Sequence, residues 1–588
     1  MRLANLRYIP QIRTSAVSGF RGINKCEDIA DDEFVEAQGV SLRNYPAICS
    51  RNKDGLKFEH VPIDDETPFI RACFYHNNKI NLIVDYKKNN SNIESVLIEG
   101  ITLVEGSSIS GRPIINNIIK IGYYKYSPIV VLMGSNVCLF AGNGQVFNTI
   151  TKERKSINQS MSVFNAVFEP AFNGSAFTKI FLPNSNIVFS KYDAVSILGC
   201  VNKEFNTTKI ITDIGTDYIV VAGKINERFR NDERLYIERT APRFSWVCES
   251  KNRLWGCSYD GKEIRASKLG DPYNFNVFEG ISTDSYAASV GSEGSFTACA
   301  SFLGHIYYFK ENTIHKVFGD KPANFQIIDY EVKGVKFGCG DSICVIDDIM
   351  YYAGIDGIYA YDGTIPVNIS KKLGDIKLDN VCGGELEGNY IFSSTYSIDN
   401  ANDSRLKSII VDIYIYYPKY KSFILYKTES SLYKKELYTS IAYALHDKKY
   451  RFTKYKDKLL CWNYHSISYI YDSSSLFETS INSDDNRTSC LISKYMQEST
   501  IMHKYITKLL FDIELGQNST VTISLQYDDD KLWTEVFSTA SESHKTISVP
   551  ILPRRCKKFR YKIDAIKDFI LRGVVKFIEE GSEVDGFI

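Results

Sequence analysis

The chain has 588 residues, too many for one ordinary domain, so its length predicts about two to four folding units. Hydrophobic residues make up 44% and charged residues 24%, as in a globular protein with a sizeable core. The 70 basic and 70 acidic residues cancel to a formal net charge of +0, which excludes the overall basic excess typical of proteins that neutralise many phosphates. Any contact with nucleic acid must therefore come from a local surface.

Aromatic residues make up 13% of the chain, with 39 Tyr and 34 Phe, and such side chains favour β-sheet. The 14 cysteines are scattered singly, and the closest two are Cys339 and Cys344. This spacing predicts free thiols in a reducing cytoplasm, not a disulfide scaffold or a zinc site. The N-terminal residues lack the apolar segment of a signal peptide, and no run of about 18 apolar residues predicts a membrane-spanning segment.

From residue 61 onward, short apolar or aromatic runs alternate with turn dipeptides. Asn143-Gly144, Asp260-Gly261, Asp356-Gly357 and Asp362-Gly363 can supply the positive φ angles that tight hairpins need. The resulting antiparallel meanders recur about every 35 to 50 residues, a period typical of β-propeller blades. We therefore expect a β-propeller of six or seven blades, its first part in 61–159 and its remainder in 241–480. A pair of large β-sandwiches is the alternative.

Three further segments complete the predicted all-β fold. Residues 1–60 are rich in turn residues and show no sustained periodicity, which predicts an extended N-terminal strap. Residues 160–240 interrupt the meanders with strands of their own and are expected to form an inserted small β-barrel. A polar stretch at 472–489 marks the boundary to 481–588, whose alternating strands predict a C-terminal β-sandwich. A helix is conceivable there only in short pieces such as 503–515.

Catalytic signatures are missing from the sequence. None of the eight histidines stands in an HExxH pattern or a close cluster with acidic residues. His305 and His315 lie in apolar, strand-like runs, where a packed histidine is favoured over a ligand or a base. There is no GxSxG elbow, Walker loop or strand-following GxGxxG, and the GCGDS at 338–342 is expected to be a turn. The sequence predicts no enzyme, no catalytic, cofactor-binding or metal-binding residue, and no cofactor.

Two charged segments near the C-terminus are candidate binding sites. In the acidic run 528–530, Asp528 stands with Trp533 at the spacing of the Asp-box of sialidase propellers, but Gln526 replaces the Ser of that motif and Asp530 its Gly. A calcium loop would need alternating acidic ligands and a closing Glu, so an acidic hairpin tip is favoured. The basic residues in 553–558 can contact phosphate or an acidic partner, although a solvated loop between strands is favoured.

Several longer phrases carry a family likeness. They are FRGINKCEDIADDEFVEAQGVSLRNYPAICSR (20–51), IRASKLGDPYNFNVFEGISTDSYAASVGSEGSFTACASFLGHIYYFKENTIHKVFG (264–319), GIDGIYAYDGTIPVNIS (354–370), QYDDDKLWTEVF (526–537), PILPRRCKKFRYKI (550–563) and KFIEEGSEV (576–584). Together they resemble the tailed-phage family of packaged-DNA stabilisation, or tail-hub, proteins. The likeness rests on the number and order of the phrases, and it is weakest in the insert and in 380–480.

This resemblance implies a structural virion protein in the phage neck or tail, assembled in the host cytoplasm. The expected assembly is a homo-oligomer, a hexameric ring that forms a hub or nozzle below the portal and adaptor. The ring would retain packaged DNA through transient, non-specific contacts in its lumen and let it pass during ejection. It would also anchor tail-fibre or tail-tip proteins. The family brings no catalytic residues to this sequence.

Two other functions remain open from the sequence. One is a tail-associated propeller that binds or hydrolyses glycans of the host surface, because such chemistry needs only two well-placed carboxylates. The other is an intracellular scaffold outside any virion. Neither has a residue pattern of its own in this sequence.

Overall fold

The computed structural model describes residues 12–52, 57–58, 69–87, 93–101, 117–120, 129–133, 136–141, 144–149, 151–172, 175–399, 407–432, 445, 448–456, 458–464, 466–470, 487–497, 503–528, 530–540, 544–552 and 554–580. Its elements are β-strands and four short 3-10 segments, which confirms the predicted all-β class. None of the helical segments in this part of the chain is long and apolar enough to cross a membrane. Of the predicted turns, Asn143 lies outside the described residues.

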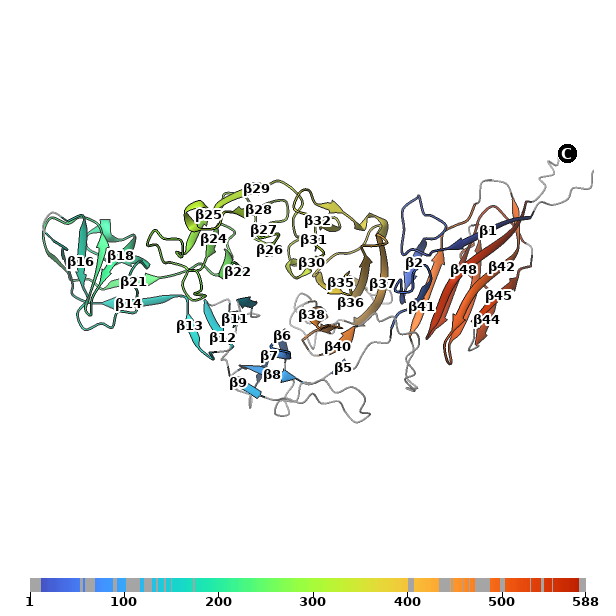
Figure 1. The fold of residues 1–588 in the computed structure, drawn as a ribbon, viewed down its shortest axis with the longest axis horizontal. Coiled ribbons are helices and arrows are strands. Elements are labelled where there is room, and N and C mark those ends of the chain that lie inside the picture. Colours follow the sequence, from blue (N-terminus) through green and yellow to red (C-terminus); the bar gives the residue numbers. More distant parts are fainter. Residues whose placement is uncertain are drawn as a thin grey trace, which may run out of the picture.

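Seven antiparallel meanders of four strands occupy the middle of the molecule, six as sheets of their own and the one at 382–432 as part of a nine-stranded sheet (Figure 1). The first three are β6 (Phe69–His76), β7 (Lys79–Lys87), β8 (Ile93–Ile101) and β9 (Asn117–Lys120); β10 (Ile129–Met133), β11 (Asn136–Ala141), β12 (Gln145–Asn148) and β13 (Arg154–Ser156); and β22 (Phe244–Ser250), β23 (Arg253–Ser258), β24 (Glu263–Ala266) and β25 (Tyr286–Ser289). The next two are β26 (Ala298–Phe302), β27 (His305–Phe309), β28 (Ile314–Phe318) and β29 (Gln326–Tyr330); and β30 (Cys344–Ile346), β31 (Ile349–Ala353), β32 (Ile358–Tyr361) and β33 (Val367–Asn368). The last two are β34 (Cys382–Leu386), β35 (Asn389–Asp399), β36 (Lys407–Tyr417) and β37 (Ser422–Leu432); and β38 (Arg451–Tyr455), β39 (Lys458–Trp462), β40 (Ile467–Ile470) and β5 (Lys57–Phe58).

The turn dipeptides lie where the sequence predicts them. Asp260-Gly261 joins β23 to β24, and Asp362-Gly363 follows β32. The φ angles of Gly261 and Gly363 are +75° and +97°, a region that only glycine enters at little cost. Asp356-Gly357 joins β31 to β32 as predicted, but Gly357 does not adopt the expected positive φ. The segment GCGDS is a turn as predicted, with a 3-10 segment at Gly340–Ser342.

The meanders follow one another around a ring (Figure 1). The first strand of one lies beside the first strand of the next in the pairs β10 and β22, β22 and β26, β30 and β34, β34 and β38, and β38 and β6. Phe74 of β6 and Phe147 of β12 share an apolar cluster, which joins β6–β9 to β10–β13. The last meander is completed by β5, a strand from far earlier in the chain that pairs with β40.

The insert forms an open eight-stranded sheet at one end of the molecule (Figure 1). Its strands, in sheet order, are β14 (Gln159–Val163), β21 (Leu235–Arg239), β17 (Ala194–Leu198), β18 (Thr208–Ile214), β19 (Tyr218–Ala222), β16 (Phe177–Phe181), β15 (Ala166–Pro170) and β20 (Phe229–Asn231). The predicted barrel is not closed among these described strands, because β14 and β20 remain the two ends of the path. A bulge between Ile211 and Asp213 lets β18 take part in both halves, which fold over one apolar core around Phe168.

Buried polar contacts fasten the insert to the ring. Arg239 donates from Nη1 to Oδ2 of Asp193 at 2.7 Å, with both side chains buried. Asn274, between β24 and β25 of the ring, donates to the other carboxylate oxygen of Asp193 at 3.0 Å. Asp193 also forms an isolated bridge with Val277. One carboxylate therefore joins the two bodies.

Two facing sheets form the C-terminal body. One contains β3 (Val40–Ser41), β4 (Ile48–Ser50), β48 (Phe569–Glu580), β42 (Lys504–Leu515) and β45 (His544–Pro550), with β1 (Ile12–Ser18) on β48 and β46 (Arg555–Cys556) on β42. The other continues β34–β37 through β2 (Phe34–Gln38), β41 (Thr488–Ser493), β47 (Phe559–Ile566), β43 (Thr520–Tyr527) and β44 (Thr534–Ala540). Phe511 and Tyr561 meet edge to face between the sheets, 5.6 Å apart. The short helix conceivable at 503–515 is wrong, because this segment alternates buried and partly exposed residues as strand β42.

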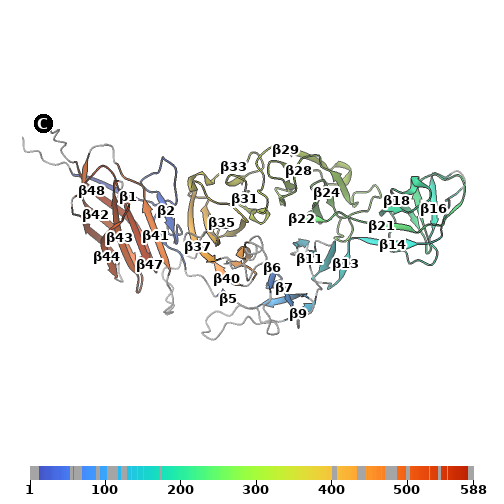
Figure 2. The ribbon, with the colours of Figure 1, turned by 180° about the vertical axis from the view of Figure 1, so that it is seen from behind.

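The N-terminal segment, expected as a strap, supplies strands to both bodies. β2 pairs parallel with β37 of the ring and antiparallel with β41 of the C-terminal body. Ion pairs hold the loop before it: Asp31 contacts Lys494 at 2.7 Å and Lys576 at 3.1 Å. A view from behind shows the same order of C-terminal body, ring and insert (Figure 2).

Candidate functional site

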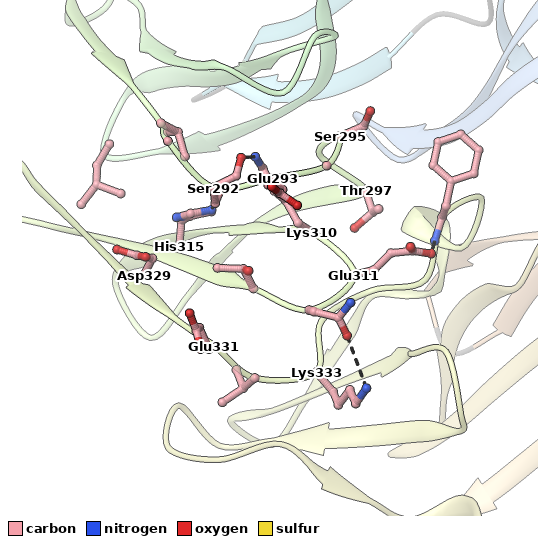
Figure 3. A pocket seen from close by; sticks show the side chains of 18 of the residues that line it. Ser292, Glu293, Ser295, Thr297, Lys310, Glu311, His315, Asp329, Glu331 and Lys333 are labelled. Carbon is pink, nitrogen blue, oxygen red and sulfur yellow. Dashed lines mark hydrogen bonds between the residues drawn. The ribbon is translucent and has the colours of Figure 1, made fainter.

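A cavity of about 1350 Å³ opens beside the meander β26–β29. Its walls come from the loop after β25, the turn between β27 and β28, the strands β28 and β29, and the loop after β29. The side chains labelled in Figure 3 surround this hollow, and they are predominantly polar or charged. The chemistry of the cavity is set by carboxylates, amines and one exposed aromatic ring. The carboxylates are those of Glu293, Glu311, Asp329 and Glu331, the amines are those of Lys310 and Lys333, and the ring is that of Phe337.

Lys310 is the structural anchor of the cavity. Its side chain is 2% exposed, and its ammonium donates to the carbonyl oxygens of Gly261 at 2.9 Å and Ser292 at 2.6 Å. It also lies 4.8 Å from the centre of the Phe296 ring. Burial lowers the pKa of Lys310. The ammonium thus fixes the glycine-rich loop after β25 against the neighbouring meander.

Ser292 and His315 form a hydrogen-bonded pair in the wall. Ser292 Oγ lies 2.9 Å from His315 Nε2, and the histidine is 1% exposed. Burial and the nearby Lys310 ammonium lower the pKa of His315 to about 4, while Asp329 acts in the opposite direction. Asp329 stands opposite His315 in the β28–β29 register, but the structure shows no hydrogen bond between these two described residues.

This pair is poorly suited to activate a serine nucleophile. A general base works best when its pKa lies near the working pH, and a neutral imidazole with a pKa of about 4 binds a proton weakly. The third member that usually orients such a histidine is not hydrogen-bonded to it here. The geometry supports a structural role, in which His315 positions the Ser292 loop.

The carboxylates give the cavity its electrostatic character. None of Glu293, Glu311, Asp329 and Glu331 forms an ion pair with a described residue. Glu311 accepts the backbone N–H of Phe337 at 2.9 Å, and Lys333 donates to Asn312 at 3.3 Å (Figure 3). Four carboxylates against two amines leave a net negative wall. This surface, which we name the acidic pocket, suits a cationic or hydroxyl-rich group.

Of the residues that line this pocket, the sequence analysis predicts a role for one, His315. His315 was singled out as a packed histidine and does lie buried in the wall, whereas His305 is half-buried outside the pocket wall. Ser292, Lys310 and the four carboxylates were missed, since they come from segments up to about 40 residues apart without a shared pattern. The glycine-rich run GSEGS at 291–295 was the available signal.

The charged C-terminal segments meet on one edge of the C-terminal body. Asp528 accepts the backbone N–H groups of Lys557 at 2.8 Å and Lys558 at 3.0 Å, while Asp530 pairs with Arg554 at 2.6 Å. Asp528 and Asp530 therefore fasten the basic segment to the hairpin tip. Asp529 and Pro553 lie outside the described residues.

In the described part of the chain, no group of three or more His, Cys, Asp or Glu residues is arranged to hold a metal ion. The thirteen cysteines whose side chains are described are free. Burial raises the pKa of Cys73, Cys344 and Cys490 to about 12, so these thiols are unreactive near neutral pH.

Comparisons with known proteins do not assign a family. No protein-family model and no curated protein matches the chain. Similar solved structures include a phage phi92 endosialidase, with 9% identity, a TM-score of 0.30, and coverage of 79% of this chain and 76% of that one. An exo-beta-1,3-galactanase from Phanerochaete chrysosporium has 8% identity and a TM-score of 0.19, covering 86% and 95%. Hsv2 from Kluyveromyces lactis has 7% identity and a TM-score of 0.24, covering 62% and 98%. These scores carry no argument about function.

Proposed function

We propose that the seven meanders form a seven-bladed β-propeller with an inserted β-unit and a C-terminal β-sandwich. Three observations support this finer description of the all-β fold. Six meanders are four-stranded sheets of their own and the seventh, β34–β37, begins the nine-stranded sheet; first strands lie side by side in five neighbouring pairs, and β5 completes the last unit from the N-terminal side. A pair of large sandwiches would instead place long sheets face to face, an arrangement that the described residues show in the C-terminal body.

We further propose that the chain is a structural protein of a tailed-phage virion, the subunit of a ring-shaped tail hub or nozzle. The proposal includes a homo-oligomer of six copies below the portal and adaptor, retention of packaged DNA and anchoring of distal tail proteins. The sequence phrases of the tail-hub family support it. The observation that carries it is the path of the N-terminal segment, because β2 joins ring and C-terminal body within one continuous nine-stranded sheet. Such a stiff connection suits a load-bearing part.

The ends of the molecule fit this role. The insert and the C-terminal body lie on opposite sides of the ring (Figure 1), so neighbouring proteins can bind each without blocking the other. The insert exposes Phe164, Leu198 and Val201, which are 57%, 48% and 55% exposed. Exposed apolar side chains of this size mark contact surfaces when they gather on one unit.

The test is assembly of the purified full chain. Mass photometry and negative-stain microscopy should show rings at micromolar concentration, and the rings should bind purified portal–adaptor complexes. The protein should also be present in purified phage particles. A chain that stays monomeric, fails to bind the portal–adaptor complex and is missing from the particles would refute the proposal.

A second function is favoured by the acidic pocket. Four unpaired carboxylates around one cavity can supply the acid and base of glycoside hydrolysis, or bind the hydroxyls of a glycan. This alternative predicts cleavage or binding of host-envelope polysaccharide that disappears in Glu311→Gln or Asp329→Asn. Unchanged polysaccharide after prolonged incubation, together with no binding by the wild-type chain, would exclude it.

A further inference from the structure

A second charged surface lies at the edge of the C-terminal body, far from the acidic pocket. It contains basic, aromatic and leucine side chains from the segment after β41, the β43–β44 connection, the segment from the end of β45 through β46, and the start of β47. We name it the basic tip, and its members are Tyr495, Lys531, Leu532, Trp533, Leu552, Arg554, Arg555, Lys557, Lys558 and Arg560. Six of these residues are basic, against three aspartates at 528–530.

Arg560 is held rigidly at the centre of this tip. Its guanidinium carbon lies 4.4 Å from the Tyr495 ring centre and 5.1 Å from that of Trp533. Its Nε donates to Oε1 of the buried Gln526 at 2.7 Å, and the Tyr495 hydroxyl donates to the same oxygen at 3.0 Å. The Nη groups of Arg560 have no hydrogen-bond partner among the described residues. They form a preorganised fork for a carboxylate.

Exposed apolar residues surround this fork. Leu532 is 81% exposed and Leu552 is 91% exposed, the highest values among the large hydrophobic side chains described. Lys557 and Arg555 are exposed, and neither forms an ion pair with a described residue. Rigid Arg, Trp and Tyr side chains with exposed leucines are the composition of a protein contact centre.

The acidic pocket complements the basic tip in charge and in apolar content. Its carboxylates have no described cationic partner, and its rim carries Phe337, which is 70% exposed. Figures 1 and 2 show β43, β44 and β47 at one end of the molecule and β26–β29 within the ring, with β34–β37 and β2 between them. Within one chain these surfaces cannot meet.

We propose that the basic tip of one copy docks into the acidic pocket of a second copy. Arg560 and Lys557 would contact carboxylates of the pocket, while Leu532 and Leu552 pack against Phe337. Such a contact joins different patches of two identical chains, so repetition gives a closed ring or an open filament. The inference rests on the self-assembly part of the proposed function and specifies the surfaces responsible for it.

Charge reversal on each side separates the possibilities. The tip variant combines Lys557→Glu with Arg560→Glu, and the pocket variant combines Glu293→Lys with Glu331→Lys. We expect each variant to self-associate at least about tenfold more weakly than the wild type. Arg230→Glu, an exposed arginine in the insert, should assemble normally as the matched control. Lys557→Glu alone provides a second tip test, since its side chain is exposed and its contact with Asp528 is made by the backbone.

Mixing the two variants gives the decisive result. The pocket variant keeps an intact tip and the tip variant keeps an intact pocket, and the two reversed surfaces are again opposite in charge, so an equimolar mixture should recover the assembly that neither variant shows alone. Thermal unfolding of each variant at the wild-type midpoint verifies that it is folded. If wild-type rings form and the variants assemble equally well, the docking contact is wrong while the ring proposal stands. Monomeric variants that also fail to pair overturn the contact, and a monomeric wild type overturns both proposals.

Discussion

Buried polar side chains in this protein position loops, and the pair Ser292 and His315 shows how. Both the Lys310 ammonium and the His315 imidazole are almost inaccessible, yet each has a hydrogen-bond partner in the loop after β25. A buried polar group without a partner costs about 1–3 kcal/mol, so these contacts define the loop conformation. The shape of the acidic pocket depends on them.

At the level of single residues, we predict that the titration of His315 makes the free energy of unfolding depend on pH. The unfolded chain binds a proton at His315 with the ordinary pKa of about 6.5, whereas the folded chain does so only at about 4. Between these values the unfolded state binds more protons, so stability decreases as the pH falls through this window. The expected contribution is about 1–2 kcal/mol after allowance for solvent screening. Urea unfolding at pH 7, 5.5 and 4.5 measures it.

The control for this prediction is His315→Gln. Glutamine can still hydrogen-bond Ser292 but does not titrate, so the loss of stability in acid should be smaller than in the wild type by that amount. An identical pH dependence in both proteins would show that His315 is not responsible.

Among the secondary-structure elements, β2 links the ring to the C-terminal body. It lies between β37 and β41, and the chain before it passes close to the β37 backbone. Ile23 donates its N–H to the carbonyl of Phe423 at 2.8 Å, and a Cβ on Gly22 would lie 2.0 Å from that oxygen. Only glycine permits this approach.

Gly22→Ala should therefore destabilise the protein. We expect the free energy of unfolding to decrease by about 1–3 kcal/mol, as for other substitutions that overpack an interior. Gly291→Ala is the matched control, because a Cβ there meets nothing within 4 Å. Chemical denaturation of both variants gives the comparison. Equal stability of Gly22→Ala and the wild type would mean that the segment before β2 is not held against β37.

At the scale of the whole molecule, the insert has the properties of a removable unit. Its first and last strands are paired, with Gln159 opposite Arg239, so the chain leaves and returns at neighbouring positions. It also has an apolar core of its own. Insertions of this kind leave the host fold intact because few backbone hydrogen bonds of the host depend on them.

Replacing residues 160–238 by a short Gly-Ser linker should leave the remaining chain folded. The contacts of Asp193 with Asn274 and Val277 are lost, so a lower thermal midpoint is expected without loss of cooperative unfolding. Far-ultraviolet circular dichroism and calorimetry test this. An unfolded insert-deletion protein would contradict the prediction.

As a contrast, removal of residues 12–52 should abolish soluble expression, because it leaves the edges of β37, β41 and β48 unpaired.

The sequence by itself determined the local structure. Period-two alternation and turn residues such as Gly261 and Gly363 act over a few residues, so the all-β class and the hairpins were predictable. The strand at 504–515 also alternates, although its charged and apolar residues left a short helix conceivable.

Only the tertiary structure decided which distant segments meet. Long-range strand pairing places β2 between β37 and β41 and gives the insert its open path. It also brings Glu293, Glu311 and Asp329 together around one cavity. No local pattern encodes such pairing, because the hydrogen bonds of one strand edge fit any other strand and the choice depends on packing of the whole core. The same reason explains why the acidic pocket and the basic tip became visible only in three dimensions.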